Sequence, residues 1–338
     1  MTDEVILQVK DLRTYFYTDA GVVKAVDGLT FDLHKGETLG LVGESGSGKS
    51  VTNLSVIKLI QTPPGKIEGG EVLFNGEDLL KMSDARLREI RGDRIAMIFQ
   101  DPMSSLNPYL RISTQMIETI CLHQGLNKKA AKEKAIEMLK LTGIPAAEKR
   151  IDGYPHQFSG GMRQRVMIAM GLSCNPDILI ADEPTSALDV TIQAQILDLM
   201  QDLTHRLGTA VILITHSLGV VAGVCDTIVV MYAGRIVERG TTEDIFYDTK
   251  HPYTQGLIKS VPRLDRDDEG RLFSIEGQPP NVVDLPDCCP FYPRCHKALP
   301  VCKNRYPPVV QFSGTHHAAC WLYAQKDGGT FTSEDTTK

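Results

Sequence analysis

The sequence of 338 residues lacks long hydrophobic runs, although 42% of its residues are hydrophobic. Apolar stretches such as residues 211–214 and 228–231 stop after a few residues, whereas a helix that crosses a bilayer needs ~20. The first residues, 1–4, also lack the basic and apolar regions of a signal peptide. We therefore expect a cytosolic protein with enough apolar material for one large domain and a smaller one.

The sequence also lacks an excess of basic residues, because 36 Lys and Arg stand against 42 Asp and Glu, a net charge of -6. This charge argues against a nucleic-acid partner held by bulk electrostatics. Paired Cys-x-x-Cys knuckles, the usual zinc signature, are absent as well. In a reducing compartment the eight cysteines are better interpreted as thiols or metal ligands than as disulfides.

The patterns that are present predict an α/β core. Residues 5–33 alternate apolar with polar side chains, which is typical of antiparallel strands. Residues 38–42, 178–181 and 211–215 are nearly continuous apolar runs, and the last two predict parallel strands covered on both faces. A helical pattern at residues 192–207 separates those two runs.

Two regions depart from this α/β pattern. Between about residues 108 and 160 a helical insert is predicted, in which Asn127 caps a helix that Gly143 ends. The apolar residues of that helix recur at helical spacing and are Ala131, Ala135, Met138 and Leu139. From about residue 263 the chain turns to Pro, Asp, Gly and Cys, which predicts domains at 1–262 and 263–338.

The most informative motif is a glycine-rich loop between a predicted strand and a predicted helix. Its residues are Gly43, Glu44, Ser45, Gly46, Ser47, Gly48, Lys49 and Ser50. Glycines let backbone N–H groups approach phosphates, Lys49 reaches the β and γ phosphates, and Ser50 supplies an oxygen to Mg²⁺. A glycine-rich turn that binds nothing is disfavoured, because strand, loop and helix occur in the required order. We expect one apolar face on the helix, made by Val51, Leu54, Ile57 and Leu59.

Polar residues follow two of the predicted buried strands. Asp182 and Glu183 end one strand, so their carboxylates should emerge at the cleft that holds Lys49. A solvated acidic turn is the weaker alternative. His216 follows the next strand, where a satisfied polar histidine competes with a functional one.

The order of these motifs resembles that of the ATPase subunit of an ABC transporter. The resemblance implies that Asp182 helps to hold Mg²⁺ and that Glu183 polarises the attacking water. It also implies that Gln100, in the stretch 99–101, touches Mg²⁺ or that water, and that His216 contacts the γ-phosphate. Phosphoryl transfer needs little covalent help, so positioning and charge stabilisation supply most of the rate.

The resemblance assigns two further contacts to the nucleotide. Phe16 is similar to the aromatic residue that stacks on adenine, although Tyr15 is adjacent and core packing is an equal alternative for Phe16. Ser159, Gly160 and Gly161 are similar to the signature motif, which in this family completes the ATP site of a second subunit in a head-to-tail dimer. The commonest form of this motif is Leu-Ser-Gly-Gly-Gln. This chain departs from it at the two flanking positions, which are Phe158 and Met162.

The whole chain is most similar to ATPases of bacterial oligopeptide and dipeptide importers, through residues 99–108, 190–196, 230–234 and 251–254. The resemblance implies ATP-driven peptide uptake with two membrane permease subunits, a second ATPase subunit or a copy of this one, and a substrate-binding protein reached through the complex. The chain would lie at the cytoplasmic face of the cell membrane as a peripheral subunit. A nickel or other small-solute importer is the alternative, and a non-transport ABC ATPase is a weaker one.

Five of the eight cysteines fall in the last predicted domain, at positions 288, 289, 295, 302 and 320. Four of them are similar to the [4Fe-4S] motif of peptide-importer ATPases and are Cys289, Cys295, Cys302 and Cys320. Zinc ligands and unliganded thiols remain the alternatives. The other three, Cys121, Cys174 and Cys225, are predicted to be plain core residues.

Overall fold

The computed structural model describes residues 4–101, 105–186, 188–261, 274–326 and 329–330. The chain divides into two compact units, each assembled from several segments. The first unit comprises Met1–Leu7, Leu33–Thr38 and Phe74–Ile214, and the second comprises Gln8–Asp32, Leu39–Leu73 and Thr215–Lys338. The boundary predicted near residue 263 lies outside the described residues.

Three neighbouring parallel strands form the centre of the first unit: β6 (Ile95–Ile98), β7 (Ile178–Asp182) and β8 (Ala210–Thr215), with β7 in the middle. All residues of β7 and β8 are buried, which confirms the prediction of covered parallel strands. Helix α8 (Val190–Leu207) makes the crossover between β7 and β8 that parallel strands require.

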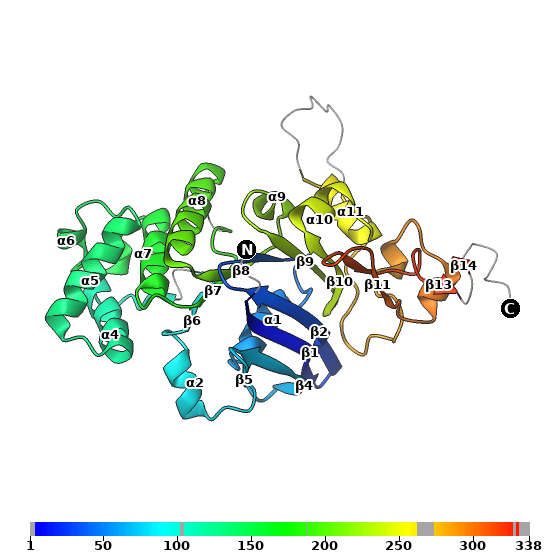
Figure 1. Ribbon diagram of the computed structural model, residues 1–338, viewed down its shortest axis with the longest axis horizontal. Helices are drawn as coiled ribbons and strands as arrows, with labels where there is room; N and C mark the ends of the chain where they lie inside the picture. Colours follow the sequence, from blue (N-terminus) through cyan, green and yellow to red (C-terminus); the bar gives the residue numbers. More distant parts are fainter. Residues whose placement is uncertain (1–3, 102–104, 187, 262–273, 327–328, 331–338) are drawn as a thin grey trace. The chain divides into compact units, whose positions relative to one another are not determined.

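Helices account for much of the remaining first unit. They are α4 (Ile112–Gln124), α5 (Lys128–Leu141), α6 (Ala147–Arg150), the short 3₁₀ helix η1 (Pro155–Gln157) and α7 (Gly160–Leu172), and Figure 1 shows α4 to α7 packed together. The Asn127 side chain accepts hydrogen bonds from the backbone N–H groups of Lys129 and Ala130, at 3.1 and 3.0 Å, and so caps α5. All four predicted apolar residues of α5 are buried, so this helix is confirmed. The unit also contains β5 (Glu77–Asp78) and α2 (Asp84–Ile90).

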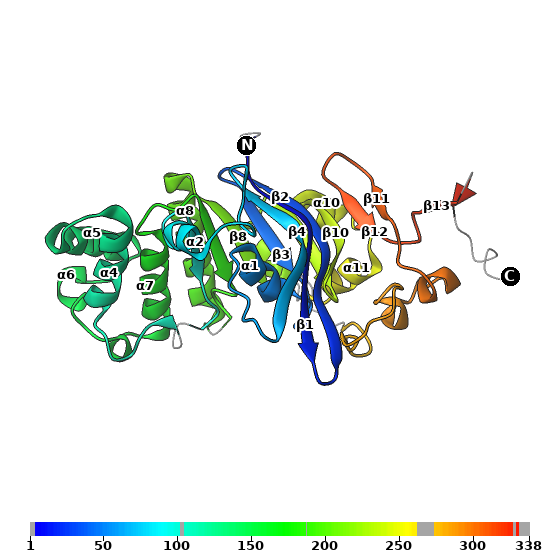
Figure 2. The ribbon, with the colours of Figure 1, turned by 90° about the horizontal axis from the view of Figure 1, so that it is seen from below.

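The second unit contains a long hairpin, β1 (Val5–Thr18) and β2 (Gly21–His34), beside β4 (Gly65–Phe74). Only residues 19–20 connect β1 to β2, and so short a connection joins strands only when they are antiparallel, as predicted. Figure 2 shows these two strands running side by side.

A second set of strands in this unit has the order β3, β9, β10, β12, β11. Their bounds are β3 (Thr38–Val42), β9 (Thr227–Tyr232), β10 (Arg235–Thr241), β12 (His317–Ala319) and β11 (Val309–Gln311). β3 and β9 are parallel, and the following pairs are antiparallel. In the β10–β12 pair, Glu238 lies opposite Ala318 and Arg239 opposite His317. The described residues from 274 onward, which we call the C-terminal region, therefore add two strands, β12 and β11, beside β10.

The remaining elements of the second unit are short. They are α1 (Lys49–Val56), α9 (Leu218–Val221), α10 (Thr242–Tyr247), α11 (Pro252–Lys259), η2 (Tyr292–Arg294), η3 (Pro300–Lys303), β13 (Gln325–Lys326) and β14 (Gly329–Thr330). Within the described part of the chain, no helix combines the length and the apolar character that crossing a bilayer takes.

The predicted apolar face of the helix after the glycine loop is wrong. α1 ends at Val56, so Leu59 lies beyond the helix and is 42% exposed. The buried face is instead largely polar and consists of Lys49, Thr52, Asn53, Ser55 and Val56. Burial of two of these hydroxyls is tolerated because Thr52 Oγ1 donates to Gly48 O at 2.9 Å and Ser55 Oγ donates to Val51 O at 2.6 Å.

The buried carboxylate of Glu238 fixes the segment before α11. It accepts hydrogen bonds from the backbone N–H groups of Lys250 and His251, at 2.6 and 3.0 Å, and lies 3.0 Å from His316 Nε2. Burial lowers the pKa of His251 to about 3, so its neutral ring can accept the Tyr253 N–H at Nδ1, at 3.1 Å. This contact caps α11 and fixes Tyr253 within the second unit.

Candidate nucleotide site

The glycine loop connects β3 to α1 and has a backbone that only glycine fits at two positions. A Cβ atom on Gly43 would lie 2.3 Å from Met231 O, and one on Gly48 would lie 2.2 Å from Ala25 O. Gly48 also has a φ of 102°, in the left-handed region that favours glycine. The loop is therefore built for close backbone packing, and a glycine-rich loop before a helix is the type of backbone that binds phosphate groups.

Lys49, the first residue of α1, is held against the loop and is 6% exposed. Its Nζ donates hydrogen bonds to Gly43 O at 2.7 Å, Glu44 O at 2.9 Å and Ser47 Oγ at 3.4 Å. These contacts fix a positive charge within the loop, where phosphates would bind. Ser50 follows in the first turn of α1 and is half-buried, while Ser45 and Gly46 are exposed.

The first unit brings Gln100 and Glu183 together. Gln100 Nε2 donates a hydrogen bond of 3.0 Å to Glu183 Oε2, although the two residues are 83 positions apart. Asp182 is the last residue of β7 and is 6% exposed. Glu183 follows with a φ of 45°, an uncommon backbone conformation for a residue other than glycine. The turn thus keeps Asp182 in the strand end and aims the next carboxylate at Gln100.

The predicted adenine contact and the histidine both lie in the second unit. Tyr15 Oη donates to Asp27 Oδ1 at 2.8 Å, and burial together with this hydrogen bond raises the pKa of Tyr15 to about 12. Tyr15 therefore serves the fold, whereas the half-buried ring of Phe16 retains exposed area. His216 is the exposed residue directly after β8.

The three signature residues occupy the start of α7 in the first unit, as predicted for a helix opening. Ser159 is the N-cap, and its Oγ accepts the backbone N–H of Met162 at 3.3 Å. Ser159 and Gly160 are exposed, and Gly161 is half-buried against Ile192, whose Cγ2 would lie 3.0 Å from a Cβ on that glycine. An exposed helix N-terminus with bare glycine backbone is suited to bind an anion from outside the unit.

The two units thus carry different parts of the predicted site. The first unit holds Gln100, Asp182, Glu183 and the signature residues 159–161. The second unit holds Phe16, the glycine loop and His216.

Cysteines of the C-terminal region gather in a small buried core. Cys302 packs there with Trp321, and Cys289 lies against this core and donates its backbone N–H to Cys302 O at 3.0 Å. Burial and the neighbouring thiols raise the pKa of Cys289 and of Cys320 to about 12. Among the described residues, no group of three or more His, Cys, Asp or Glu side chains is arranged to hold a metal ion.

The other cysteines follow the prediction in part. Cys174 and Cys225 are buried, which confirms them as core residues. Cys121, on α4, is only half-buried and so departs from the prediction of a core residue.

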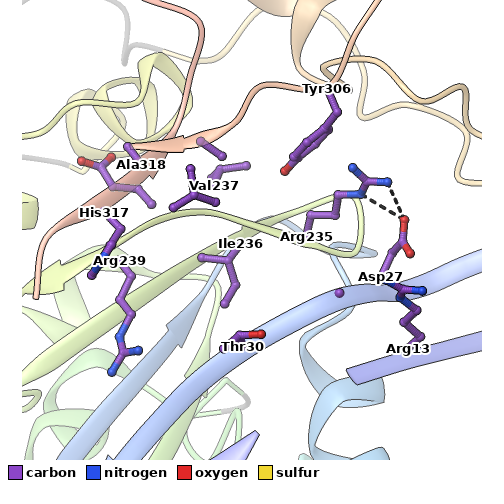
Figure 3. Close-up of a pocket in the computed structure, with 14 residues that line it drawn as sticks. Arg13, Asp27, Thr30, Arg235, Ile236, Val237, Arg239, Tyr306, His317 and Ala318 are labelled. Atoms are coloured by element: carbon purple, nitrogen blue, oxygen red, sulfur yellow. Dashed lines mark hydrogen bonds and ion pairs between the residues drawn. The ribbon is translucent and has the colours of Figure 1, made fainter. Parts of the chain in front are cut away.

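Elsewhere in the second unit lies a cavity of about 480 Å³ that the sequence did not indicate. Figure 3 shows Arg235 pointing to Asp27 there, with hydrogen bonds of 3.0 and 2.7 Å, and the guanidinium lies 4.0 Å from the ring centre of Tyr306. Burial opposes the ionised form of Asp27, but hydrogen bonds from Tyr15 and Arg235 outweigh it and hold the pKa of this carboxyl below its usual range. None of the described residues that line the cavity belongs to the predicted nucleotide site.

Comparison with known families gives two matches. The family model described as ABC transporter matches residues 26–186. The model described as the C-terminal region of oligopeptide/dipeptide transporters matches residues 237–302.

Curated relatives match nearly the whole chain. The oligopeptide transport ATP-binding protein OppD of Bacillus subtilis (strain 168) is 52% identical over 317 residues, which cover 94% of this chain and 88% of the relative. The dipeptide transport ATP-binding protein DppD of the same organism is 51% identical over 323 residues, which cover 96% of each chain. Matches of this length include the C-terminal region as well as the first matched segment.

Among solved structures, the ATP-binding cassette MJ0796 in a dimeric, post-hydrolysis state with ADP and Pi is similar in fold. Its TM-score is 0.63 at 27% identity, with 70% of this chain and 98% of that chain covered. The similarity therefore lies in the cassette, and part of this chain falls outside the match.

Proposed function

Because this chain belongs to the ATP-binding proteins of ABC transporters, in the oligopeptide and dipeptide branch, we propose that it hydrolyses ATP to power the uptake of dipeptides or oligopeptides. The observation that carries the proposal is identity of 51–52% that runs through the C-terminal region as well as the nucleotide-binding part. The two relatives are an oligopeptide and a dipeptide protein, which favours peptides over nickel as the transported solute.

The loop at 43–50 binds the triphosphate through backbone N–H groups and the Lys49 ammonium, and Phe16 stacks on adenine. Mg²⁺, when bound, neutralises phosphate charge. Ser50, Asp182 and Gln100 would hold it, because hydroxyl, carboxylate and amide oxygens are the donors that Mg²⁺ takes. Asp182 is the last residue of β7 and has a carboxylate of the kind that Mg²⁺ takes, which supports this role.

Hydrolysis depends on the residues after β6, β7 and β8. Glu183 polarises the attacking water, and His216 contacts the γ-phosphate. The amide of Gln100 donates a hydrogen bond to Oε2 of Glu183, which orients this carboxylate. Charge stabilisation and positioning therefore act together in the step that cleaves the phosphate.

We infer that ATP is bound between two ATPase subunits arranged head to tail. The exposed N-terminus of α7, with Ser159, Gly160 and Gly161, supports this arrangement because it offers phosphate-binding backbone at the surface of its unit. The second subunit is a homologous ATPase or a copy of this chain. Two membrane permease subunits complete the complex, which receives peptide from a substrate-binding protein and places this chain peripherally at the cytoplasmic face of the cell membrane.

We also propose two domains for this chain. Residues 1–262 form the ATPase domain with a helical subdomain at about 108–160, for which α4, α5 and α6 are the supporting elements. Residues 263–338 form the C-terminal module, supported by η2, η3 and the β11–β12 pair.

Reconstituted transport tests the proposed function. The chain, its membrane subunits and the second ATPase are placed in proteoliposomes with the substrate-binding protein, and ATP-dependent accumulation of labelled dipeptide, labelled oligopeptide and Ni²⁺ is measured. We expect a peptide to accumulate and Ni²⁺ not to, while a matched complex with Glu183→Gln accumulates neither. Accumulation of Ni²⁺ without either peptide would contradict the peptide assignment, and native mass spectrometry of the same complex gives the number of ATPase subunits.

We also propose that Cys289, Cys295, Cys302 and Cys320 hold a [4Fe-4S] cluster with a structural role. The thiols fit this group in one respect: the pKa of Cys289 is raised first by burial and then by Cys302, Cys320 and Cys295, so these four side chains interact electrostatically. The raised pKa values favour neutral thiols, so binding a cluster would require their deprotonation, and iron would supply the positive charge that stabilises the thiolate ligands.

Replacement of Cys295 by Ser is expected to remove iron from the anaerobically purified protein and bleach its visible absorbance, while ATP binding is retained. One ligand of the proposed cluster is lost, whereas the glycine loop is untouched. The matched control is Cys288→Ser. It makes the same chemical change at a half-buried cysteine that is next to Cys289 in the sequence but outside the proposed ligand set. Iron and acid-labile sulfide analysis gives the result, and stoichiometric zinc without iron in the wild-type protein would refute the cluster.

A further inference from the structure

Glu44, the second residue of the glycine loop, is held by a side chain from the C-terminal region. Arg294 Nη1 donates to Glu44 Oε2 at 2.6 Å, and Arg294 Nη2 donates to Glu44 Oε1 at 2.9 Å. The two parallel bonds form a bidentate ion pair across 250 positions of sequence, within the second unit. The Arg294 side chain is 4% exposed and that of Glu44 is 26% exposed, so solvent screens this pair only in part.

The guanidinium of Arg294 is fully used in this position. Its Nε donates to Glu276 O at 3.1 Å, Nη2 also donates to Ile275 O at 3.3 Å, and Nη1 also donates to Tyr232 Oη at 3.3 Å. With the two bonds to Glu44, five acceptors surround a group that has five N–H donors. The hydrogen bonds that Arg294 donates to Glu44 are the main reason that the pKa of Arg294 lies above its usual range. These contacts outside the loop therefore hold the Arg294 guanidinium in the orientation in which it binds Glu44.

A second contact fixes the backbone of the same loop residue. The hydroxyl of Tyr253 accepts the Glu44 N–H at 2.9 Å. Tyr253 is fully buried and packs against Tyr232 and Phe291, with ring centres 4.6 and 5.3 Å away. Phe291 lies three residues before Arg294, so one aromatic cluster supports both groups that hold Glu44.

The contacts continue from Glu44 to the nucleotide-binding lysine. Glu44 O accepts a hydrogen bond from Lys49 Nζ, while its N–H and carboxylate are bound by Tyr253 and Arg294. All three polar parts of Glu44 are thus occupied. A carboxylate in a loop that binds a triphosphate would also repel that ligand, and the ion pair with Arg294 neutralises it.

We propose that Arg294 is a positioning residue for ATP binding, which holds Glu44 in place and cancels its charge beside the phosphates. The inference rests on the nucleotide role proposed for the loop and adds that the C-terminal region sets the affinity of that loop for ATP. In this role Arg294 contacts Glu44 directly and is assigned no contact with the nucleotide. Its effect passes entirely through Glu44.

Replacement of Arg294 by Met tests this role. We expect about tenfold weaker ATP binding and a similar rise in the KM for ATP, because an unpaired carboxylate is left in the loop. The kcat should change less than about twofold, since the variant alters ground-state and transition-state binding alike. Arg305→Met is the matched control, because it removes an exposed arginine of the same region and should leave both constants unchanged.

Two further variants separate charge from folding. Arg294→Lys keeps a positive charge but loses the paired geometry, so its affinity should lie between those of wild type and Arg294→Met. Adding Glu44→Gln to Arg294→Met removes the unpaired charge and should recover most of the lost affinity, which a merely unfolded region would not allow. Calorimetric titration with a nonhydrolysable ATP analogue and thermal unfolding are measured for each variant.

The outcomes are distinguishable. Wild-type protein that binds no nucleotide would refute the nucleotide role of the loop and this inference with it. Wild-type binding that is matched by Arg294→Met and Arg294→Lys would overturn the inference alone. Loss of affinity that Glu44→Gln fails to recover would also overturn it, since the effect would then not pass through the charge of Glu44.

Discussion

The Glu183→Gln variant is expected to bind ATP normally and to lose about a hundredfold or more of its hydrolysis rate. The amide keeps the shape of the side chain and can still lie 3.0 Å from Gln100, so the turn after β7 should be retained. It no longer carries the negative charge that polarises water. Calorimetry with ATP and release of phosphate, both in the assembled complex, measure the two effects separately.

Glu133→Gln serves as the control, because it makes the same chemical change at an exposed position on α5. Its binding and hydrolysis should equal those of wild type. A Glu183→Gln complex that hydrolyses ATP within a few-fold of wild type would show that another group polarises the water.

The Lys49→Ala variant is expected to bind ATP about tenfold to a hundredfold more weakly than wild type, because it loses charge-assisted hydrogen bonds to phosphate. The ammonium also donates to Gly43 O and Glu44 O, so its removal loosens the loop as well as discharging it. Isothermal calorimetry with ATP and Mg²⁺ measures the loss.

Lys149→Ala, an exposed lysine on the short helix α6, is the matched control and should leave the affinity unchanged. Equal affinities for ATP in wild type and Lys49→Ala would remove Lys49 from the proposed site. Together with Glu183→Gln, this pair of variants distinguishes the group that binds the nucleotide from the group that hydrolyses it.

The sequence by itself determined the features that depend on neighbouring residues. The apolar runs of β7 and β8, the cap at Asn127 and the glycine loop with Lys49 all arise from local patterns. Such patterns are readable because a strand, a cap or a phosphate loop is built by residues within a few positions of one another. The family motifs are also local patterns. The family that they indicated is the family of the relatives, which are 51–52% identical to this chain over nearly its whole length.

The buried side of α1 shows where local patterns fail. The expected apolar face was wrong because the surface that covers α1 in the fold accepts polar side chains. Thr14 Oγ1 on β1, for example, lies 2.7 Å from Ser55 Oγ. Periodicity in the helix alone cannot reveal such a partner, since it lies 41 positions away.

Only the tertiary structure decided which distant residues meet. It placed Gln100 against Glu183 and Arg294 against Glu44, and it paired β12 with β10. These contacts join positions 78 to 250 apart, and their partners are chosen by the order of strands and the path of the chain. No spacing in the sequence encodes that path, because a long connection can return a segment to many different neighbours. The nucleotide loop could therefore be found by its residues, whereas the arginine that holds it appeared only in the folded chain.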